Sequence, residues 1–171
     1  MAQEQQVEIS CGEGAGTYAA VVTAQNLDFF LEAGKQPDVT GKSGEALVAA
    51  LQALAKRRLA IMGIERRKDG KWNDGPNGEP AFQEFNDAGT LVYAARWKDG
   101  RRNDGPNGEP AVQKFNDAGT LVYAARYKDG ELVKELSAGE ICAWIEQQKA
   151  REKAAAIKAA FGDRLKLRPS P

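Results

Sequence analysis

The sequence predicts an α+β protein with a single-layer antiparallel β-meander of 30-residue hairpin repeats, flanked by an N-terminal helix and a long C-terminal helix. The first observation is a tandem duplication: residues 68–97 return as residues 98–127 with only five differences. The second is that strand-like runs inside each copy alternate with Asn, Asp and Gly turns. The third is helical apolar spacing on both sides of the copies. A repeat of this length buries its apolar side only against its neighbours, so it indicates a surface built by stacked units.

Residues 1–59 form a predicted N-terminal α/β segment. Its first half is β-rich around a Gly-rich turn, and residues 26–34 (NLDFFLEAG) have a short helix-like pattern. Residues 44–58 carry leucines at helical spacing and follow Ser43, a residue type that caps helix N-termini. We therefore expect a helix over residues 44–58.

Residues 60–133 form the predicted β-hairpin repeat sheet. In each copy a strand such as PAFQEF meets an NDAG turn, and a second strand such as TLVYAARW follows. Lys-Asp-Gly turns begin the links between units, and the NDGPNGE segments are loops that cannot continue a strand. Residues 60–67 (AIMGIERR) read as a degenerate first copy of the second strand. Tyr93 and Trp97 share one face of their strand, which we expect to be the core side, and Arg96 lies on the other.

Residues 134–171 are predicted to form the C-terminal helix and tail. Ser137 and Glu140 have the spacing of a capping box, so we expect a helix to begin there. The first half of this helix carries an apolar stripe suited to cover part of one sheet face. The last residues, 163–171, have the composition of a loosely ordered tail.

The composition excludes several classes of chemistry. The chain has no histidine, which removes Ser-His-Asp and Cys-His nucleophiles, histidine bases and histidine metal ligands. Cys11 and Cys142 form no CxxC pair and are expected to be free and buried. The 24 basic and 24 acidic residues balance, and no run is apolar enough for a membrane span. We expect a cytoplasmic protein that is not an enzyme and binds no cofactor and no metal.

Two motifs have alternative interpretations. In the first copy Asn73, Asn77, Gly78 and Glu84 fall at positions 1, 5, 6 and 12 of a calcium loop, but position 3 is a glycine and the second copy has a lysine at position 12. A turn held by Asx hydrogen bonds is the favoured interpretation. The GEGAG run at residues 12–16 leads into β-like sequence instead of a helix, which disfavours a phosphate-binding loop.

Aromatic and guanidinium groups mix in the repeats, as they do at protein interfaces and at sites for single-stranded nucleic acid. Arg96 and Arg126 are expected to form a row across the sheet, either as a solvated row paired with neighbours or as a binding face. Some positions change chemistry between the copies, either by drift after a recent duplication or because each copy presents a different surface. The candidate partner-binding residues are Trp72, Phe82, Glu84, Arg96, Arg101, Arg102, Lys114 and Arg126.

The repeat also resembles a known family. Trp97 and Tyr127 stand directly before Lys-Asp-Gly, Asn-Gly follows at 77–78 and 107–108, and Phe85 and Phe115 precede the hairpin turns. This pattern resembles the MORN-repeat-variant units of YwqK-type antitoxin-like proteins over residues 60–133, while the termini resemble no family. The resemblance implies short hairpins joined into a single-layer sheet and fixes no function.

The function predicted from the sequence is a non-catalytic protein-binding module. The neutral charge, the recent duplication and the lack of catalytic groups favour a small bacterial or phage inhibitor, antitoxin-like, that occludes a larger protein. The alternative is a nucleic-acid-binding protein that uses the arginine and aromatic side chains. Membrane binding is not expected, and a homodimer through the C-terminal helix or a sheet edge is compatible with the main interpretation.

Overall fold

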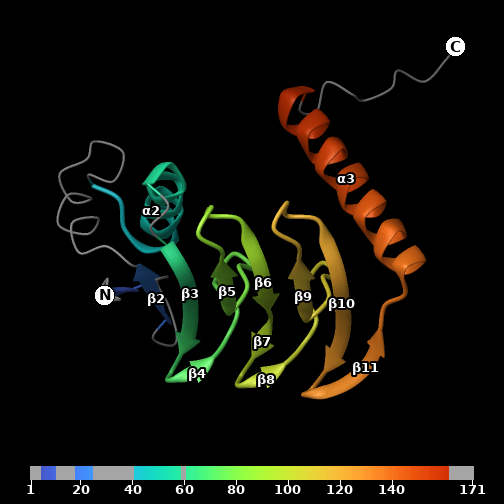
Figure 1. The fold of residues 1–171 in the computed structure, drawn as a ribbon, viewed down its shortest axis with the longest axis horizontal. Helices are drawn as coiled ribbons and strands as arrows, with labels where there is room; N and C mark the ends of the chain where they lie inside the picture. Colours follow the sequence, from blue (N-terminus) through green and yellow to red (C-terminus); the bar gives the residue numbers. More distant parts are fainter. Residues whose placement is uncertain (1–4, 11–17, 25–40, 59–60, 162–171) are drawn as a thin grey trace, which may run out of the picture. The chain divides into compact units, whose positions relative to one another are not determined.

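A computed structural model describes residues 5–10, 18–24, 41–58 and 61–161 of the 171-residue chain. The chain divides into two compact units, residues 1–135 and 136–171. The Gly-rich run at 12–16, the helix-like run at 26–34, Cys11 and the tail lie outside the described residues. The described residues contain a nine-stranded antiparallel sheet, a two-stranded antiparallel sheet and two helices, which confirms the α+β class (Figure 1).

The first unit is built on one antiparallel sheet whose strand order follows the order of the chain. Figure 1 shows these strands side by side. Because β1 pairs with β2 and β2 pairs with β3, these two N-terminal strands belong to the same sheet as strands of the repeats. In sheet order the strands are β1 (Gln5–Ser10), β2 (Tyr18–Ala24), β3 (Ile61–Lys68), β5 (Phe82–Phe85), β6 (Leu91–Ala95), β9 (Val112–Phe115), β10 (Leu121–Lys128) and β11 (Glu131–Glu135).

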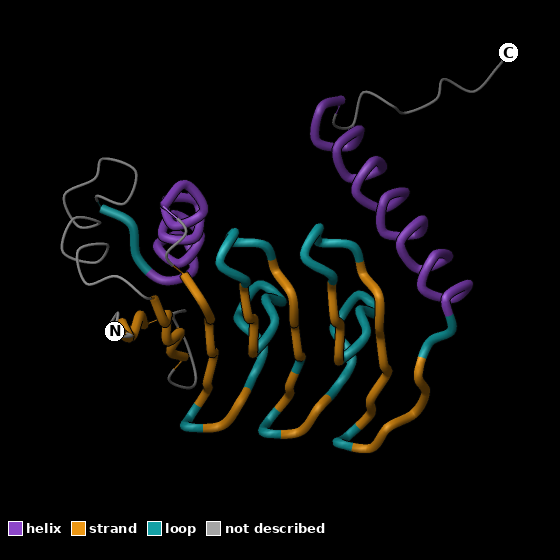
Figure 2. The backbone as a smooth tube through the Cα atoms, viewed as in Figure 1, coloured by secondary structure: helices purple, strands orange, loops and turns teal. Residues whose placement is uncertain are grey.

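Each copy interrupts one strand with a loop that leaves the sheet. β4 (Lys71–Trp72) and β5 both pair with β3, and residues 73–81 make an excursion between them (Figure 2). In the second copy β7 (Trp97–Lys98) pairs with β8 (Arg101–Arg102) as a separate two-stranded sheet, and residues 103–111 form the matching excursion before β9. Residues 30 apart make matching bonds: the N–H of Arg66 donates to Ala81 O at 2.7 Å, and that of Arg96 to Ala111 O at 2.8 Å.

The Lys-Asp-Gly turns owe their tightness to two consecutive residues of left-handed backbone. Asp69, Asp99 and Asp129 have φ values of 50°, 51° and 51°, and each is followed by a glycine of positive φ. Two positive φ values in succession define the type I′ turn, whose twist suits a hairpin and which favours Asp-Gly. The sequence Asp-Gly therefore fixes where each long strand reverses.

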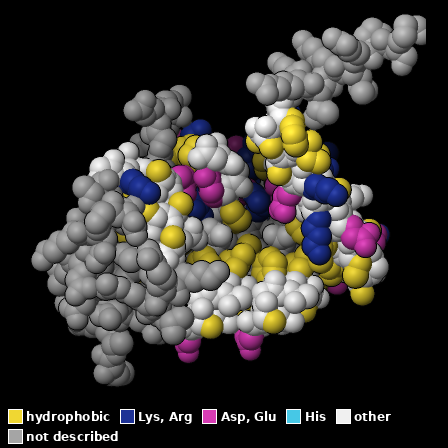
Figure 3. Space-filling view, turned by 90° about the horizontal axis from the view of Figure 1, so that it is seen from above, with side chains coloured by type: hydrophobic (Ala, Val, Ile, Leu, Met, Phe, Trp, Pro, Cys, Tyr) yellow, Lys and Arg dark blue, Asp and Glu magenta, His cyan; other side chains and the backbone are white. Residues whose placement is uncertain are grey.

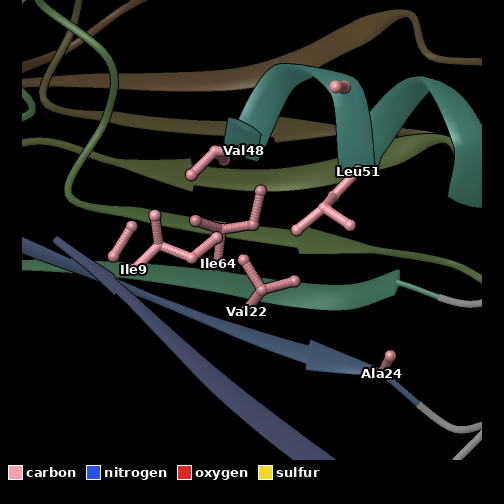
Figure 4. Packing of buried hydrophobic residues seen from close by; sticks show 8 residues of the cluster. Ile9, Val22, Ala24, Val48, Leu51 and Ile64 are labelled. Atoms are coloured by element: carbon pink, nitrogen blue, oxygen red, sulfur yellow. The ribbon is translucent and has the colours of Figure 1, made fainter. Parts of the chain in front are cut away.

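The main core of the first unit lies where helix α2 (Gly44–Arg58) packs on β1, β2 and β3. The helix has the bounds predicted from the sequence. Alternate strand residues point at it, and Figure 4 shows Val48 and Leu51 of the helix facing Val22 and Ile64 of the strands. All four are buried, so this end of the sheet has a covered apolar face.

The second unit is organised around helix α3 (Ala138–Phe161). The predicted capping box is present, since the Glu140 N–H donates to Ser137 Oγ at 3.3 Å and the Ser137 N–H donates to Glu140 Oε2 at 3.0 Å. Cys142 is exposed, which corrects the expectation that it is buried, because its place on the helix turns it toward solvent. No helix in the described part of the chain is both long and apolar enough to cross a membrane.

The predicted assignment of the two sheet faces is right for Ala95, which is buried on the expected core side, and wrong for the larger side chains. Arg96, expected on the outer face, is buried, whereas Tyr93 and Trp97, expected on the core side, are only half-buried. The reason is the path of the loops: residues 73–81 and 103–111 fold over the face that carries Arg96, in line with the cover that α2 provides at β3. The aromatic side chains are left on the face without this cover.

Candidate functional site

The repeat sheet presents two chemically different faces. Side chains alternate along each strand, so Arg66, Arg96 and Arg126 lie on the face that the loops cover, which we call the arginine face. The other, the aromatic face, carries a first row of Arg67, Trp72, Trp97, Arg102 and Tyr127 and a second row of Glu84, Tyr93, Lys114 and Tyr123.

On the arginine face, Arg96 holds two successive loops. Its Nη1 donates to Asp74 Oδ2 at 3.0 Å and to the Gly78 carbonyl oxygen at 2.7 Å, both in the first loop. Its Nη2 lies 3.8 Å from Glu109 Oε1 in the second loop. With a side chain only 9% exposed, Arg96 acts as a structural bracket and presents little surface to a partner.

Arg126 repeats the first half of this arrangement. Its Nη1 donates to Asp104 Oδ2 at 2.8 Å and to the Gly108 carbonyl oxygen at 3.0 Å. The chain then runs directly along β11 instead of forming another NDGPNGE loop. The side chain of Arg126 is consequently 31% exposed.

Arg66 shows how the array starts. Its Nε and Nη2 donate to the two carboxylate oxygens of Glu45 at 2.7 and 3.0 Å, so helix α2 supplies the acid that a loop aspartate supplies in the later units. Its Nη1 donates to Pro80 O and Gln83 Oε1. The side chain is 3% exposed, and the fork geometry is the strongest form of this pair.

The loops are fixed from within. Asp74 Oδ1 accepts the N–H groups of Ala81 and Trp97, both at 2.9 Å. Burial raises the pKa of Asp74 above its ordinary 3.8, although the hydrogen bond from Trp97 and the Arg96 charge oppose the shift. Burial also acts to raise the pKa of Glu109, but backbone hydrogen bonds and Arg96 outweigh it, and this pKa lies below 4.5.

The loop does not have the form of a calcium site. Asn77 donates its side-chain amide to Glu79 Oε1 at 3.0 Å, and Glu84 stands on the opposite face of the sheet from the loop. No cluster of three or more acidic or cysteine side chains in the described ranges could hold a metal ion. The favoured interpretation of a hydrogen-bonded turn agrees with this geometry.

On the aromatic face, the first row forms a continuous stack across the strands. The Arg67 guanidinium lies 4.9 Å from the Trp72 ring centroid, and the Trp72 and Trp97 rings are 5.9 Å apart. The Arg102 guanidinium then lies between two rings, 5.4 Å from Trp97 and 5.5 Å from Tyr127. Contacts of this kind are each worth on the order of 1 kcal/mol and hold flat side chains upright.

The second row mixes aromatic and charged groups. Glu84, Tyr93 and Lys114 lie in one register across β5, β6 and β9, and Glu84 and Lys114 are exposed. Lys114 Nζ lies 5.1 Å from the ring of Tyr123. The Tyr123 hydroxyl donates to Glu135 Oε1 at 2.8 Å, and this bond raises the pKa of Tyr123.

The differences between the two copies gather on the aromatic face. Four of the five place a different side chain there: Trp72 and Arg102, Phe82 and Val112, Glu84 and Lys114, and Trp97 and Tyr127. The loops, the turns' Asp-Gly and the arginine face are identical in both copies. The unchanged positions include the turn residues with positive φ and the arginines that hold the loops, so the changes lie where the fold imposes fewer constraints.

The structure divides the eight predicted partner-binding residues into three groups. Trp72, Phe82, Glu84, Arg102 and Lys114 come together on the aromatic face. Arg96 and Arg126 lie on the arginine face and bracket loops, while Arg101 is exposed at a turn. Tyr93 was missed because the sequence placed it on the core side, and Arg67 because it precedes the repeat.

A groove of about 620 Å³ lies at the end of the sheet where the Lys-Asp-Gly turns reverse the chain. Its lining repeats from unit to unit, with lysines and aspartates in alternation, and includes Lys68, Lys98, Lys128, Asp99 and Asp129. The opposite charges leave it without a strong preference for a ligand of either sign.

Comparison with known proteins yields no match to a family model, to a curated protein or to a solved structure.

Proposed function

We propose that this chain is a protein-binding module whose 30-residue hairpin repeats build one contact surface, the aromatic face, and that it acts without catalysis. The observation that carries the proposal is the clustering of four of the five differences between the copies on that face. Tryptophan, tyrosine and arginine, which dominate the face, are the side chains most enriched at energetic hot spots of protein interfaces.

The stacking within the face also supports a protein partner over single-stranded nucleic acid. Bases bind by stacking on open ring faces. Trp97 has Trp72 on one neighbouring strand and Arg102 on the other, so its ring is already in contact with both. On the aromatic face the acidic Glu84 lies in the same register as the basic Lys114, whereas nucleic-acid binding uses a surface of one positive sign. The side drawn in Figure 3 likewise shows acidic, basic and hydrophobic side chains.

The role of such binding remains a prediction from the sequence. An inhibitor or antitoxin-like protein that occludes a larger protein benefits from a rigid surface, and cation–π contacts restrain the side chains of this face. A partner bound there would meet side chains that lose little conformational freedom, because the stack already restrains them.

The test is site-specific photo-crosslinking of the full chain in a bacterial lysate. A photoreactive phenylalanine analogue replaces Tyr93 on the aromatic face and, in a matched control, Ala118 in an exposed turn. We expect a protein adduct from position 93 that is absent from position 118. The mass of the adduct separates a foreign protein from a second copy of the chain.

A contrary result is equally clear. Nucleic acid as the only adduct, with binding that weakens steeply as salt rises, would replace the proposal with the alternative. Equal crosslinking from both positions, or none from position 93, would show that the aromatic face is not a contact surface.

A further inference from the structure

We infer that the partner which the aromatic face fits is a second copy of this chain, bound face to face. The two-fold axis lies between the two faces and runs parallel to β6. The inference rests on the proposed function, because it names the occupant of the same face. A two-fold interface is self-complementary: if one residue meets another across it, the reverse contact also forms. The face satisfies this condition in its second row, in its first row and in the register of Phe82, Ala95 and Val112 that lies between them.

The first register carries opposite charges on either side of β6. Glu84 on β5 and Lys114 on β9 both pair with Tyr93 on β6. An axis along β6 exchanges the strands on its two sides, so Glu84 of one copy meets Lys114 of the other, twice. Both side chains are exposed, and neither forms an ion pair within the described part of its own chain.

The second register pairs a large side chain with a smaller one. Phe82 and Val112 both pair with Ala95. The same axis brings Phe82 opposite Val112, which is only 5% exposed, with Ala95, 2% exposed, on the axis between them, so Phe82 supplies most of the contact in this register. Two copies of Phe82 facing each other would crowd the gap of roughly 10 Å between packed sheets, whereas a large side chain facing a smaller one fills it.

The third register pairs cations with rings. Trp72 and Arg102 flank Trp97, so the axis brings the Trp72 ring opposite the Arg102 guanidinium. One strand farther out on each side, Arg67 comes opposite Tyr127. Each contact joins a guanidinium to an aromatic ring, as the contacts within the chain already do.

The divergence of the copies produces this complementarity. Two identical copies would place glutamate opposite glutamate, phenylalanine opposite phenylalanine and tryptophan opposite tryptophan. The changes at Lys114, Val112 and Arg102 replace each of these like pairs by a complementary one. One axis accounts for all three changes, so the second copy is the occupant that the observations favour.

The aromatic face is small, and its size limits the affinity that a dimer formed through it can reach. Five strands at about 4.8 Å spacing span roughly 20 Å, and the footprint lies below that of a standard stable interface. We therefore expect a dissociation constant in the micromolar range, on the order of 1–100 µM.

The test is a charge-swap cycle on the full chain, read by sedimentation velocity over a range of concentrations. Glu84→Lys places two lysines opposite each other at both symmetric contacts, and Lys114→Glu places two glutamates there. We expect each single change to weaken the dimer at least about tenfold, and the double change Glu84→Lys/Lys114→Glu to restore the affinity to within about threefold of the parent. Thermal unfolding of each variant shows that the fold is kept.

Three outcomes overturn the inference. The first is a protein that stays monomeric over the whole concentration range. In that case, a foreign protein crosslinked from position 93 would still support the proposed function. A dimer indifferent to both single changes places the contact elsewhere, at a sheet edge or on α3. Failure of the double change to restore a dimer lost in the single variants shows that Glu84 and Lys114 do not meet.

Discussion

Arg96 and Arg126 stand in identical stretches of sequence, YAAR preceded by a complete NDGPNGE loop, yet their surroundings differ. Arg96 contacts the loop before it and the loop after it, and its side chain is 9% exposed. Arg126 has only the loop before it and is 31% exposed. Local sequence therefore does not decide how far each arginine is buried. Its position in the array does.

The comparison with Arg66 extends this lesson to the other end of the array. Arg66 has no NDGPNGE loop before it, yet it is the most buried of the three arginines because Glu45 of α2 takes the place of the loop aspartate. Arrays of repeats need an atypical element at each end to close the exposed side of the terminal unit. Within the first unit, α2 provides this closure at the N-terminal end.

The largest effect is expected from breaking the closure at Arg66. Glu45→Ala leaves a buried guanidinium without its carboxylate, and the loss of one partner of a buried pair costs about 4 kcal/mol of unfolding free energy. Unfolding in urea is followed by tryptophan emission. A Trp144→Phe background removes the tryptophan of the second unit, so the signal reports the surroundings of Trp72 and Trp97 in the first unit.

The matched control for this change is Lys42→Ala, an exposed residue shortly before the same helix. It should change the unfolding free energy by less than about 0.5 kcal/mol. A loss below about 1 kcal/mol for Glu45→Ala would mean that α2 is held by its apolar contacts alone.

The second-largest loss of unfolding free energy is expected when the inner arginine, Arg96, is replaced, and it can be compared directly with the loss at the outer arginine, Arg126. Arg96→Met should cost about 3 kcal/mol, because it leaves the buried Asp74 carboxylate unpaired and frees two loops. Arg126→Met removes a half-exposed pair with a single loop and should cost about 1 kcal/mol. The same unfolding measurement applies to both variants.

The two variants serve as controls for each other, since residues 91–96 and 121–126 have the same sequence. Equal losses would show that the second loop contributes nothing to the site of Arg96. The loss in the double variant should depart from the sum of the single losses, because both arginines contact the loop of residues 103–111.

Much of the fold follows from local sequence. Helix 44–58, the capping box of Ser137 and Glu140, and the strands on either side of the turns are set by residues close to one another in the chain. These predictions hold because propensity, capping and turn chemistry act over a few residues.

The assignment of the two faces required information that is not local. Alternation placed Tyr93 and Arg96 on opposite sides, but the more hydrophobic side was taken as the core. The first loop bonds to Arg96 from 18 and 22 residues away, and no pattern in the strand itself indicates these bonds. Similarly, the stack on the aromatic face depends on strand register across both copies, which sequence spacing alone does not give.

The smallest expected effect is a pH dependence of the unfolding free energy that arises at Asp74, the carboxylate paired with Arg96. Burial raises the pKa of Asp74 above 3.8, so the folded protein holds the proton more tightly than the unfolded chain does. The stabilisation from the protonated form is present below 3.8 and is lost as the pH rises through the folded-state pKa. Asp74→Asn cannot titrate, so the stability of the parent relative to this variant should fall as the pH rises through that window. Urea unfolding of both proteins across the window measures the difference; a difference that stays constant or grows would mean that the Trp97 hydrogen bond and the Arg96 charge outweigh burial at Asp74.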